Sequence, residues 1–344
     1  MSDERTNPAE TMVPIDRVVA PLRAFFDNKL AGAILLIAGT VVALVWANSP
    51  WAETYHHLLH LEVGIEIGSA GLTKSLHHWI NDGLMGFFFF VVGLEIKREV
   101  IGGELSSIRR AMLPIAGAAG GMLVPAAAYA VLNYNGSGAH GWGIPMATDI
   151  AFALGLLALL GDRVPLGLKV FLTALAIVDD IGAILVIAIF YTDSISVFSL
   201  VAGGVGLLVA MGANRAGVRN PIVYFILGMV VWLMFLKSGV HATLAAVLMA
   251  MTIPARNKIR GERVTDRLEE QVAKLRSVGL PRGHGMVSSD AQHVLDELGL
   301  TLTKASGPLQ RLEHGLMPLV TFVVLPIFAL ANAGVTLGAD FIEA

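Results

Sequence analysis

Two adjacent aspartates, Asp179 and Asp180, lie within an almost wholly apolar stretch, VFLTALAIVDDIGAILVIAIFY, that runs from Val170 to Tyr191. The apolar run begins at Leu166 and is long enough to cross a bilayer, which takes roughly 17 to 25 helical residues. Both carboxylates fall near its midpoint, where a charged side chain costs on the order of 2.5 to 3.5 kcal/mol. Because a membrane helix needs no carboxylate for its stability, we expect these two to bind an ion or a proton.

A second polar pair, Thr148 and Asp149, occurs one apolar run earlier, in HGWGIPMATDIAFALG. Gly141, Gly143 and Pro145 precede the pair and disfavour a regular helix, so we predict a discontinuous helix here. Broken membrane helices persist where they border protein or a water-filled cavity, and their free carbonyls can coordinate a cation. The alternative is that Thr148 and Asp149 only cap the inner half of this helix.

Three carboxylates, a hydroxyl and free carbonyls form a set of oxygen ligands, which suits a hard cation and not a soft metal. Adjacent helical residues point about 100° apart, so we expect one of Asp179 and Asp180 to face the ion and the other to meet a separate partner. A carboxylate that holds either a cation or a proton, but not both, would couple the two fluxes. This pattern favours cation/proton exchange, with Na⁺ as the transported metal ion at Asp180 and Asp179 and with no resident cofactor.

The composition predicts that most of the chain lies in lipid. Of 344 residues, 55% are hydrophobic and only 15% are charged, and the mean hydropathy is +0.69. A chain with this composition is too apolar to be a water-soluble domain of this length. The net charge of -3 gives no electrostatic reason to expect nucleic acid, and the absence of cysteine excludes disulfides, thiolate metal sites and cysteine catalysis.

The apolar runs predict an all-α polytopic membrane protein with about nine transmembrane helices. Helices are expected because a closed barrel would alternate apolar and polar residues, and these runs do not alternate. The predicted spans are Leu30–Ala47, Trp79–Leu94, Ala111–Leu132, Trp142–Leu160, Leu166–Tyr191, Val197–Met211, Pro221–Leu236, Gly239–Ile253 and Leu316–Val335.

The distribution of Lys and Arg predicts the orientation. Only Lys74 and Lys237 fall in the segments on one side, and the remaining Lys and Arg fall on the other, which predicts a cytoplasmic N-terminus. The expected organisation is a cytoplasmic N-terminal segment (1–29), a membrane domain of eight spans (30–253), a cytoplasmic loop (254–315), and a ninth span with an outer tail (316–344).

Two segments outside the spans have patterns of their own. Residues 61–75 alternate apolar and polar side chains and then turn at Gly68 to Gly71, which predicts a β-hairpin outside the membrane. Its free edge could pair with a second copy in a homodimer, or it could be a simple surface hairpin. In the cytoplasmic loop, Val264, Leu268 and Leu275 at helical spacing, followed by SSDAQHVLDELG, predict two helices.

Charged residues gather at the cytoplasmic ends of the second and the last span. Together they could form an ion-attracting mouth or a proton-sensitive gate, in which a histidine titrates near neutrality. The alternative is a solvated face with no special role. The residues in question are Glu95, Lys97, Arg98 and Glu99 in GLEIKRE, and Arg311, Glu313 and His314 in RLEH.

From about Phe25 to Gly338 the sequence resembles the bacterial NhaA-type Na⁺/H⁺ antiporters. The segments that carry the resemblance are GLEIKRE, GGMLVPA, ATDIAFALG, LLGDRVPLGLKVFLTALAIVDDIGAI, LKSGVHATLA, RLEH and PIFALANAGV. The resemblance implies part of an inverted-repeat fold in a bacterial inner membrane. It also implies export of sodium or lithium in exchange for protons, which serves pH and sodium homeostasis, and no enzymatic activity.

The resemblance also implies roles for individual residues. Asp180 looks like the principal ion and proton carboxylate, and Asp179 is similar to a neighbour that pairs in the family with a lysine on a later span. Asp149 and Thr148 resemble the broken-helix residues beside the site, and the 61–75 hairpin resembles the dimer contact. The family's pH-responsive cluster matches Glu95, Arg98, Glu99, Arg311, Glu313 and His314, whereas Gln310 and Met317 replace basic or histidine residues there.

Members of this family continue with about three further spans, which complete the inverted repeat. We therefore expect that Asp179 lacks its lysine partner and that the chain is either shortened or completed by a second polypeptide. The alternative functions are a non-transporting membrane remnant or a subunit of a split antiporter. An intramembrane aspartyl protease, in which two aspartates share a proton, is disfavoured because TD and DD stand here in place of YD and GxGD.

Overall fold

The computed structural model describes residues 30–67, 70–136, 138–148, 163–192, 195–255, 261–279, 286–305 and 307–337. The chain divides into two compact units, which are described separately below. Unit 1 comprises Met1–His77, Asp149–Thr173 and Thr321–Ala344, and unit 2 comprises His78–Thr148 and Ala174–Val320.

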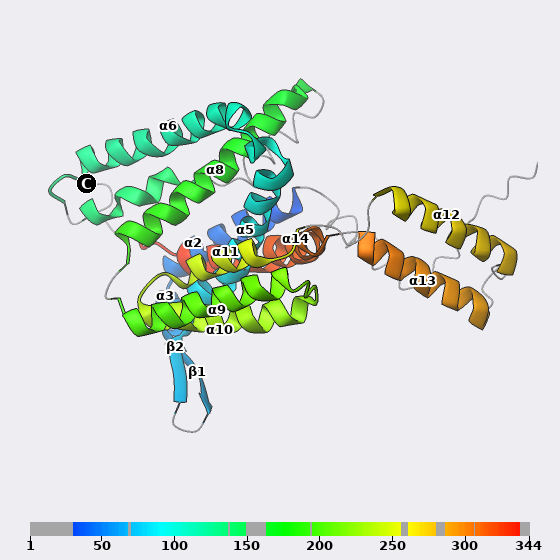
Figure 1. The fold of residues 1–344 in the computed structure, drawn as a ribbon. Coiled ribbons are helices and arrows are strands. Elements are labelled where there is room, and N and C mark those ends of the chain that lie inside the picture. Colours follow the sequence, from blue (N-terminus) through cyan, green and yellow to red (C-terminus); the bar gives the residue numbers. More distant parts are fainter. Residues whose placement is uncertain are drawn as a thin grey trace, which may run out of the picture. The chain divides into compact units, whose positions relative to one another are not determined.

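Five described helices are long and apolar enough to cross a membrane, and a sixth span results if one bent pair is counted together. The bent pair is α2 (Ala31–Ala47) and α3 (Ala52–His60), which meet at 114°. This confirms the prediction of an all-α polytopic membrane protein (Figure 1). The five are α6 (Ile108–Leu132), α8 (Leu166–Phe190), α9 (Val197–Arg215), α10 (Pro221–Ser238) and the run Pro308–Asn332, formed by α14 (Pro308–Leu319), η5 (Val320–Val324) and α15 (Leu325–Asn332).

Two further helices are less apolar or shorter. The predicted second span is α4 (Leu76–His78), the π-helix η1 (Trp79–Leu84) and α5 (Met85–Gly102), which ends in the charged GLEIKRE segment. The predicted eighth span is the short α11 (Ala242–Thr252). Each predicted span other than Trp142–Leu160 thus coincides with a described helix, and most of that one lies outside the described residues.

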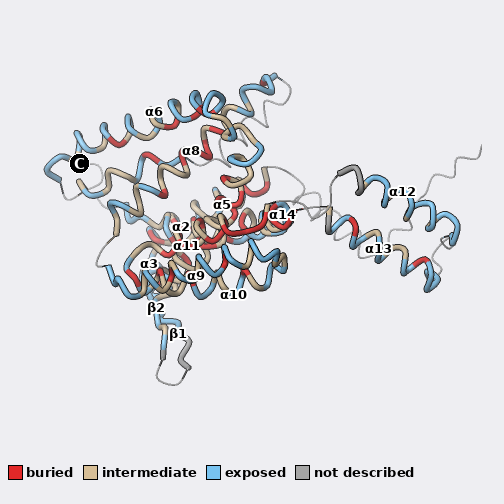
Figure 2. The backbone as a smooth tube through the Cα atoms, viewed as in Figure 1, coloured by how far each residue is buried: buried red, intermediate tan, exposed pale blue. Residues whose placement is uncertain are grey.

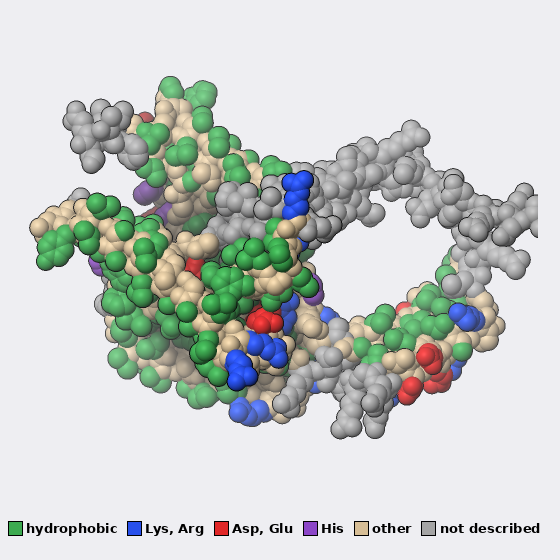
Figure 3. Space-filling view, turned by 90° about the horizontal axis from the view of Figure 1, so that it is seen from above, with side chains coloured by type: hydrophobic (Ala, Val, Ile, Leu, Met, Phe, Trp, Pro, Cys, Tyr) green, Lys and Arg blue, Asp and Glu red, His purple; other side chains and the backbone are tan. Residues whose placement is uncertain are grey.

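Large apolar side chains point outward on the spanning helices. On α6, Leu123 is 68% exposed and Val124 is 69% exposed, and on α9, Phe198 is 84% exposed. Hydrophobic side chains likewise cover much of the visible surface of the described helices (Figure 3). In water such a surface would be unfavourable, so its natural surrounding is lipid.

In unit 1, α2 packs along α15. The helices approach closely at Gly39, where an added Cβ would lie 2.8 Å from the Pro326 carbonyl oxygen. The Tyr55 hydroxyl of α3 donates to the Leu330 carbonyl at 2.8 Å. These contacts connect the first and last helices of the described chain.

The predicted hairpin is confirmed in unit 1. Strand β1 (Glu62–Ile67) pairs antiparallel with β2 (Ala70–Ser75), with Glu62 opposite Ser75 and Ile67 opposite Ala70. The tip of the turn, residues 68–69, lies outside the described residues. Pairing of the hairpin with a second copy stays a prediction.

In unit 2, α5 packs against α11, and α10 packs against both α9 and α11. Gly93 of α5 permits the first contact, because an added Cβ would lie 2.7 Å from Ala250 Cβ and 3.1 Å from Val247 Cα. Leu94 and Ile253 are fully buried in the adjoining core. Buried residues accordingly concentrate on α5 and α11 (Figure 2).

The cytoplasmic loop predicted from the sequence contains two helices, as expected. Helix α12 (Gly261–Val278) packs on α13 (Ser289–Ala305), and most of their described side chains are exposed (Figure 2). The loop is shorter than predicted at its far end, because α14 begins at Pro308 and continues into the last span. The backbone N–H of Leu309 donates to the Pro254 carbonyl at 3.3 Å and so joins the two ends of the α12–α13 segment.

Candidate functional site

Helix α8 carries both central aspartates, and they differ in burial. The Asp179 side chain is buried, with 3% of the residue exposed, whereas Asp180 is half-buried. The backbone N–H of Thr148 donates to Asp179 Oδ2 at 3.0 Å. Asp180 also takes part in polar or electrostatic interactions within the chain. The unequal burial follows from the angle between neighbouring side chains on a helix.

The segment that supplies the Thr148 N–H is not α-helical. It begins as the 3₁₀-helix η3 (Ala139–Met146) and continues through Ala147, whose φ of -84° and ψ of 138° are extended. Pro145 lies inside this helix, as the predicted interruption requires. An extended backbone leaves the Thr148 N–H free of helical bonds, so it can donate to a carboxylate. Asp149 lies outside the described residues.

Two tyrosine hydroxyls hold the start of this segment. The Tyr129 hydroxyl of α6 donates to the Gly138 carbonyl at 3.1 Å. The Tyr191 hydroxyl, which follows the end of α8, donates to the His140 carbonyl at 2.8 Å and accepts from the Gly143 N–H at 3.1 Å. Sequence reasoning missed Tyr191, because a tyrosine at the end of an apolar helix is common at membrane interfaces.

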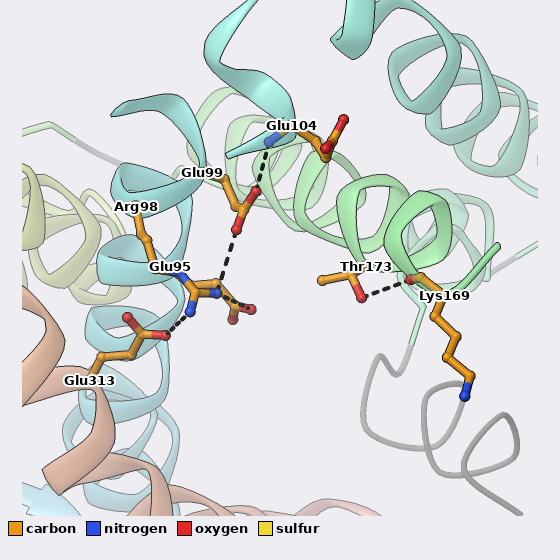
Figure 4. Close-up of polar contacts among 7 residues, drawn as sticks. All are labelled: Glu95, Arg98, Glu99, Glu104, Lys169, Thr173 and Glu313. Atoms are coloured by element: carbon orange, nitrogen blue, oxygen red, sulfur yellow. Dashed lines mark hydrogen bonds and ion pairs between the residues drawn. The ribbon is translucent and has the colours of Figure 1, made fainter. Parts of the chain in front are cut away.

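The charged cluster at the end of α5 centres on Arg98 (Figure 4). Its Nη1 lies 3.1 Å from Glu313 Oε1, and its Nη2 lies 3.6 Å from Glu95 Oε1 and 3.5 Å from Glu99 Oε1. Glu99 also accepts from the Glu104 N–H through Oε2 at 3.0 Å. The ion pair between Arg98 and Glu313 thereby joins α5 to α14.

This cluster is partly buried and has more carboxylates than cations. Glu313 is only 3% exposed, while the Arg98 side chain is 37% exposed. Within the described ranges, Glu313 Oε2 has no hydrogen-bond partner. One guanidinium balances three carboxylates here, so the uptake of a proton or a cation would relieve the excess negative charge.

Two other members of the predicted cluster are placed differently. Arg311 and His314 lie on α14 beside Glu313, and both are exposed. None of the ion pairs that the described residues form with Arg98 includes either one. Across the same described ranges, no three His, Asp or Glu side chains are arranged as ligands of a resident metal ion.

Lys97 points to a different partner from its neighbour Arg98. Its Nζ donates to the Met251 carbonyl at 2.6 Å and to the Ile253 carbonyl, and Asn214 Nδ2 donates to the intervening Thr252 carbonyl at 2.6 Å. The last carbonyls of a helix have no partner within it, and a cation at this end is favoured by the helix dipole. Lys97 and Asn214 therefore cap the carboxyl end of α11.

Comparison with known proteins identifies the family of this chain. The family model described as Na⁺/H⁺ antiporter 1 matches residues 23–344. The chain belongs to the Na⁺/H⁺ antiporter 1 family. This confirms the family resemblance inferred from the TD, DD and RLEH segments.

Curated members of the antiporter family match almost the whole chain. The Na⁺/H⁺ antiporter NhaA of Oleidesulfovibrio alaskensis is 51% identical over 336 residues, which are 98% of this chain and 75% of that protein. NhaA 1 of Saccharophagus degradans is 47% identical over 328 residues, 94% of this chain and 69% of that protein. NhaA of Koribacter versatilis is 48% identical over 344 residues, 97% of this chain and 72% of that protein.

Proposed function

We propose that this chain exchanges Na⁺ for H⁺ across a bacterial inner membrane, exporting sodium as protons enter. The single observation that carries the proposal is the pair of aspartates at the middle of the apolar helix α8 in a chain whose relatives are named Na⁺/H⁺ antiporters. Intramembrane carboxylates of this kind mark ion and proton paths.

The proposed exchange uses the different surroundings of the two aspartates. Asp180, the less buried of the two, alternately binds the transported cation and a proton. Asp179 is buried and accepts the Thr148 N–H, so it connects the residues that follow η3 to α8. Thr148 and Asp149 contribute further oxygen atoms, which are the ligands that a hard cation prefers.

The Arg98 cluster forms, in this proposal, the cytoplasmic mouth and the site of the pH response. Glu95, Glu99 and Glu313 surround the guanidinium, and their excess negative charge attracts cations and depends on pH. Arg311 and His314, which are exposed on the same helix as Glu313, line the rim of this mouth.

The proposal also covers the orientation of the chain in the membrane and its assembly with a second copy. The N-terminus and the 254–315 loop lie in the cytoplasm, and the hairpin of β1 and β2 lies outside, where its edge joins a second copy. Lithium is a second transported ion. A non-transporting remnant is not favoured, because proteins that are 47 to 51% identical over nearly the whole chain are named antiporters.

Exchange in everted membrane vesicles tests the proposal. Sodium added to vesicles with an acidic interior should release protons, which a fluorescent ΔpH probe follows. We expect Asp180→Asn to abolish this release while leaving the amount of inserted protein unchanged. Asp290→Asn, at an exposed position on α13, is the matched control and should keep the exchange. Unaltered exchange by Asp180→Asn would refute the assignment of this carboxylate.

A further inference from the structure

The 140–148 segment, which is 3₁₀-helical up to Met146 and extended at Ala147, is joined to α8 and the residue after it at two places. One is the bond from the Thr148 N–H to Asp179 near the middle of α8. The other is Tyr191, just beyond the end of α8, whose hydroxyl bonds both His140 and Gly143. Both places belong to unit 2, so this arrangement lies within one compact part of the molecule.

Ring contacts between the 140–142 residues and the end of α8 accompany the two hydrogen bonds of Tyr191. The His140 ring lies with its centroid 5.3 Å from that of Tyr191, and the Trp142 ring meets Phe190 edge to face at 5.1 Å. The hydroxyl accepts one hydrogen bond and donates another, so its hydrogen-bonding capacity is largely used. Such a contact fixes the 140–143 backbone against the end of α8.

The conformation of the segment suits a connection between these two places. Asp179 and Tyr191 are twelve residues apart, which is about 18 Å along a helix at 1.5 Å per residue. Between Gly143 and Thr148, an α-helix would advance only about 7.5 Å. The observed backbone advances farther, because a 3₁₀-helix rises about 2.0 Å per residue and an extended strand about 3.3 Å per residue. The segment therefore reaches from the end of α8 toward its middle.

We infer that Tyr191 is a positioning residue for the cation site: its hydroxyl sets where Thr148 stands relative to Asp179. This inference rests on the proposed antiport function. Tyr191 itself does not touch the ion. Without its two hydrogen bonds the 140–148 segment would move, the Thr148 N–H would leave Asp179, and oxygen ligands would no longer be held in place for the cation.

Tyr191→Phe tests the inference, because it removes the hydroxyl and keeps the ring. In everted vesicles we expect the KM for Na⁺ to rise about five- to tenfold, the size of effect that the loss of one hydrogen bond produces. The maximal rate should stay within about twofold, since the ion and proton carboxylates remain. Tyr134→Phe is the matched control, because Tyr134 is 80% exposed and we expect its KM to be unchanged.

A second readout does not depend on transport. The sequence contains no cysteine, so Ala147→Cys introduces a single thiol at an exposed position beside Thr148. Its rate of reaction with a maleimide reports the position of this backbone. We expect Tyr191→Phe to change that rate and to weaken any effect of Na⁺ on it, whereas Tyr134→Phe should change neither.

The outcomes separate this inference from the proposed function. If the unmodified chain exchanges Na⁺ for H⁺ and Tyr191→Phe leaves both the KM and the thiol reactivity unchanged, Tyr191 has no positioning role. If Tyr191→Phe lowers only the amount of folded protein or its thermal midpoint, with an unchanged KM, its role is structural and the inference is also wrong. Absence of exchange by the unmodified chain would instead overturn the proposed function.

Discussion

The backbone N–H of Thr148 and Oδ2 of Asp179 form a hydrogen bond, with 3.0 Å between nitrogen and oxygen. It joins the extended residues that follow the 3₁₀-helix η3 to a buried carboxylate on a membrane-spanning helix. A backbone donor can stabilise either a charged or an uncharged acceptor at this position. Asp179 therefore has a structural partner that is independent of its charge.

The hydrogen bond from Thr148 to Asp179 allows the structural role of Asp179 to be tested separately from its charge. Asp179→Asn keeps a carbonyl oxygen that can accept the Thr148 N–H, so we expect a thermal midpoint in detergent close to that of the unmodified protein. Asp179→Leu leaves the N–H without an acceptor and should lower the stability by about 1 to 3 kcal/mol. Equal stability of the two variants would contradict the importance of this bond.

The ion pair between Arg98 and Glu313 should stabilise the folded protein. In Arg98→Met, the buried Glu313 carboxylate loses its only ion-pair partner among the described residues. Removing one partner of a fully buried pair costs about 3 to 5 kcal/mol, and we expect about 1 to 3 here because Arg98 is 37% exposed.

Thermal unfolding in detergent measures this loss of stability. Adding Glu313→Gln to Arg98→Met should restore part of the stability, and the absence of any recovery would show that the two side chains do not interact.

Lys97 should stabilise the end of α11, although its neighbours form the charged cluster. We expect Lys97→Met to lower the thermal stability by about 1 to 3 kcal/mol, because the Met251 and Ile253 carbonyls then lose the Lys97 donor and Asn214 bonds only the Thr252 carbonyl. Lys274→Met on α12 is the control, because Lys274 pairs with Glu270 at an exposed position and its loss should have little effect. Equal effects of the two substitutions would exclude a capping role.

Gly93 should tolerate no side chain. In Gly93→Ala the new Cβ would meet Ala250 and the Val247 backbone, and overpacking of this kind costs about 1 to 3 kcal/mol. Gly120→Ala is the matched control on α6, where nothing lies within 4 Å of an added Cβ. There we expect a gain of about 0.5 to 1 kcal/mol from the better helix former. Thermal midpoints of the two variants would test the close packing of α5 on α11.

Gly143 offers a second approach to the Tyr191 junction. An added Cβ would lie 2.9 Å from the Tyr191 hydroxyl, so Gly143→Ala should displace this oxygen and raise the KM for Na⁺ as Tyr191→Phe does. The double variant should be little worse than either single one, because both act on the same hydrogen bonds. Fully additive effects in the vesicle assay would show that the two substitutions act independently.

Local sequence patterns were sufficient to predict most of the fold. Apolar runs gave the positions of the spanning helices, since hydropathy and length are properties of each segment by itself. Alternation followed by glycines predicted the hairpin of β1 and β2. The position of Asp179 and Asp180 within α8 was visible for the same reason, as was the interruption of α-helical backbone around Pro145.

Only the tertiary structure decided which partner each of two adjacent charged residues contacts. Lys97 and Arg98 are adjacent in sequence, yet one caps α11 and the other pairs with Glu313 on α14. In the same way, Glu313 is buried while His314 is exposed. Adjacent residues on a helix point in different directions, and their partners depend on which helices pack on each side. That packing arises from contacts distant in the sequence, such as Gly93 against Ala250, so no single segment could reveal it.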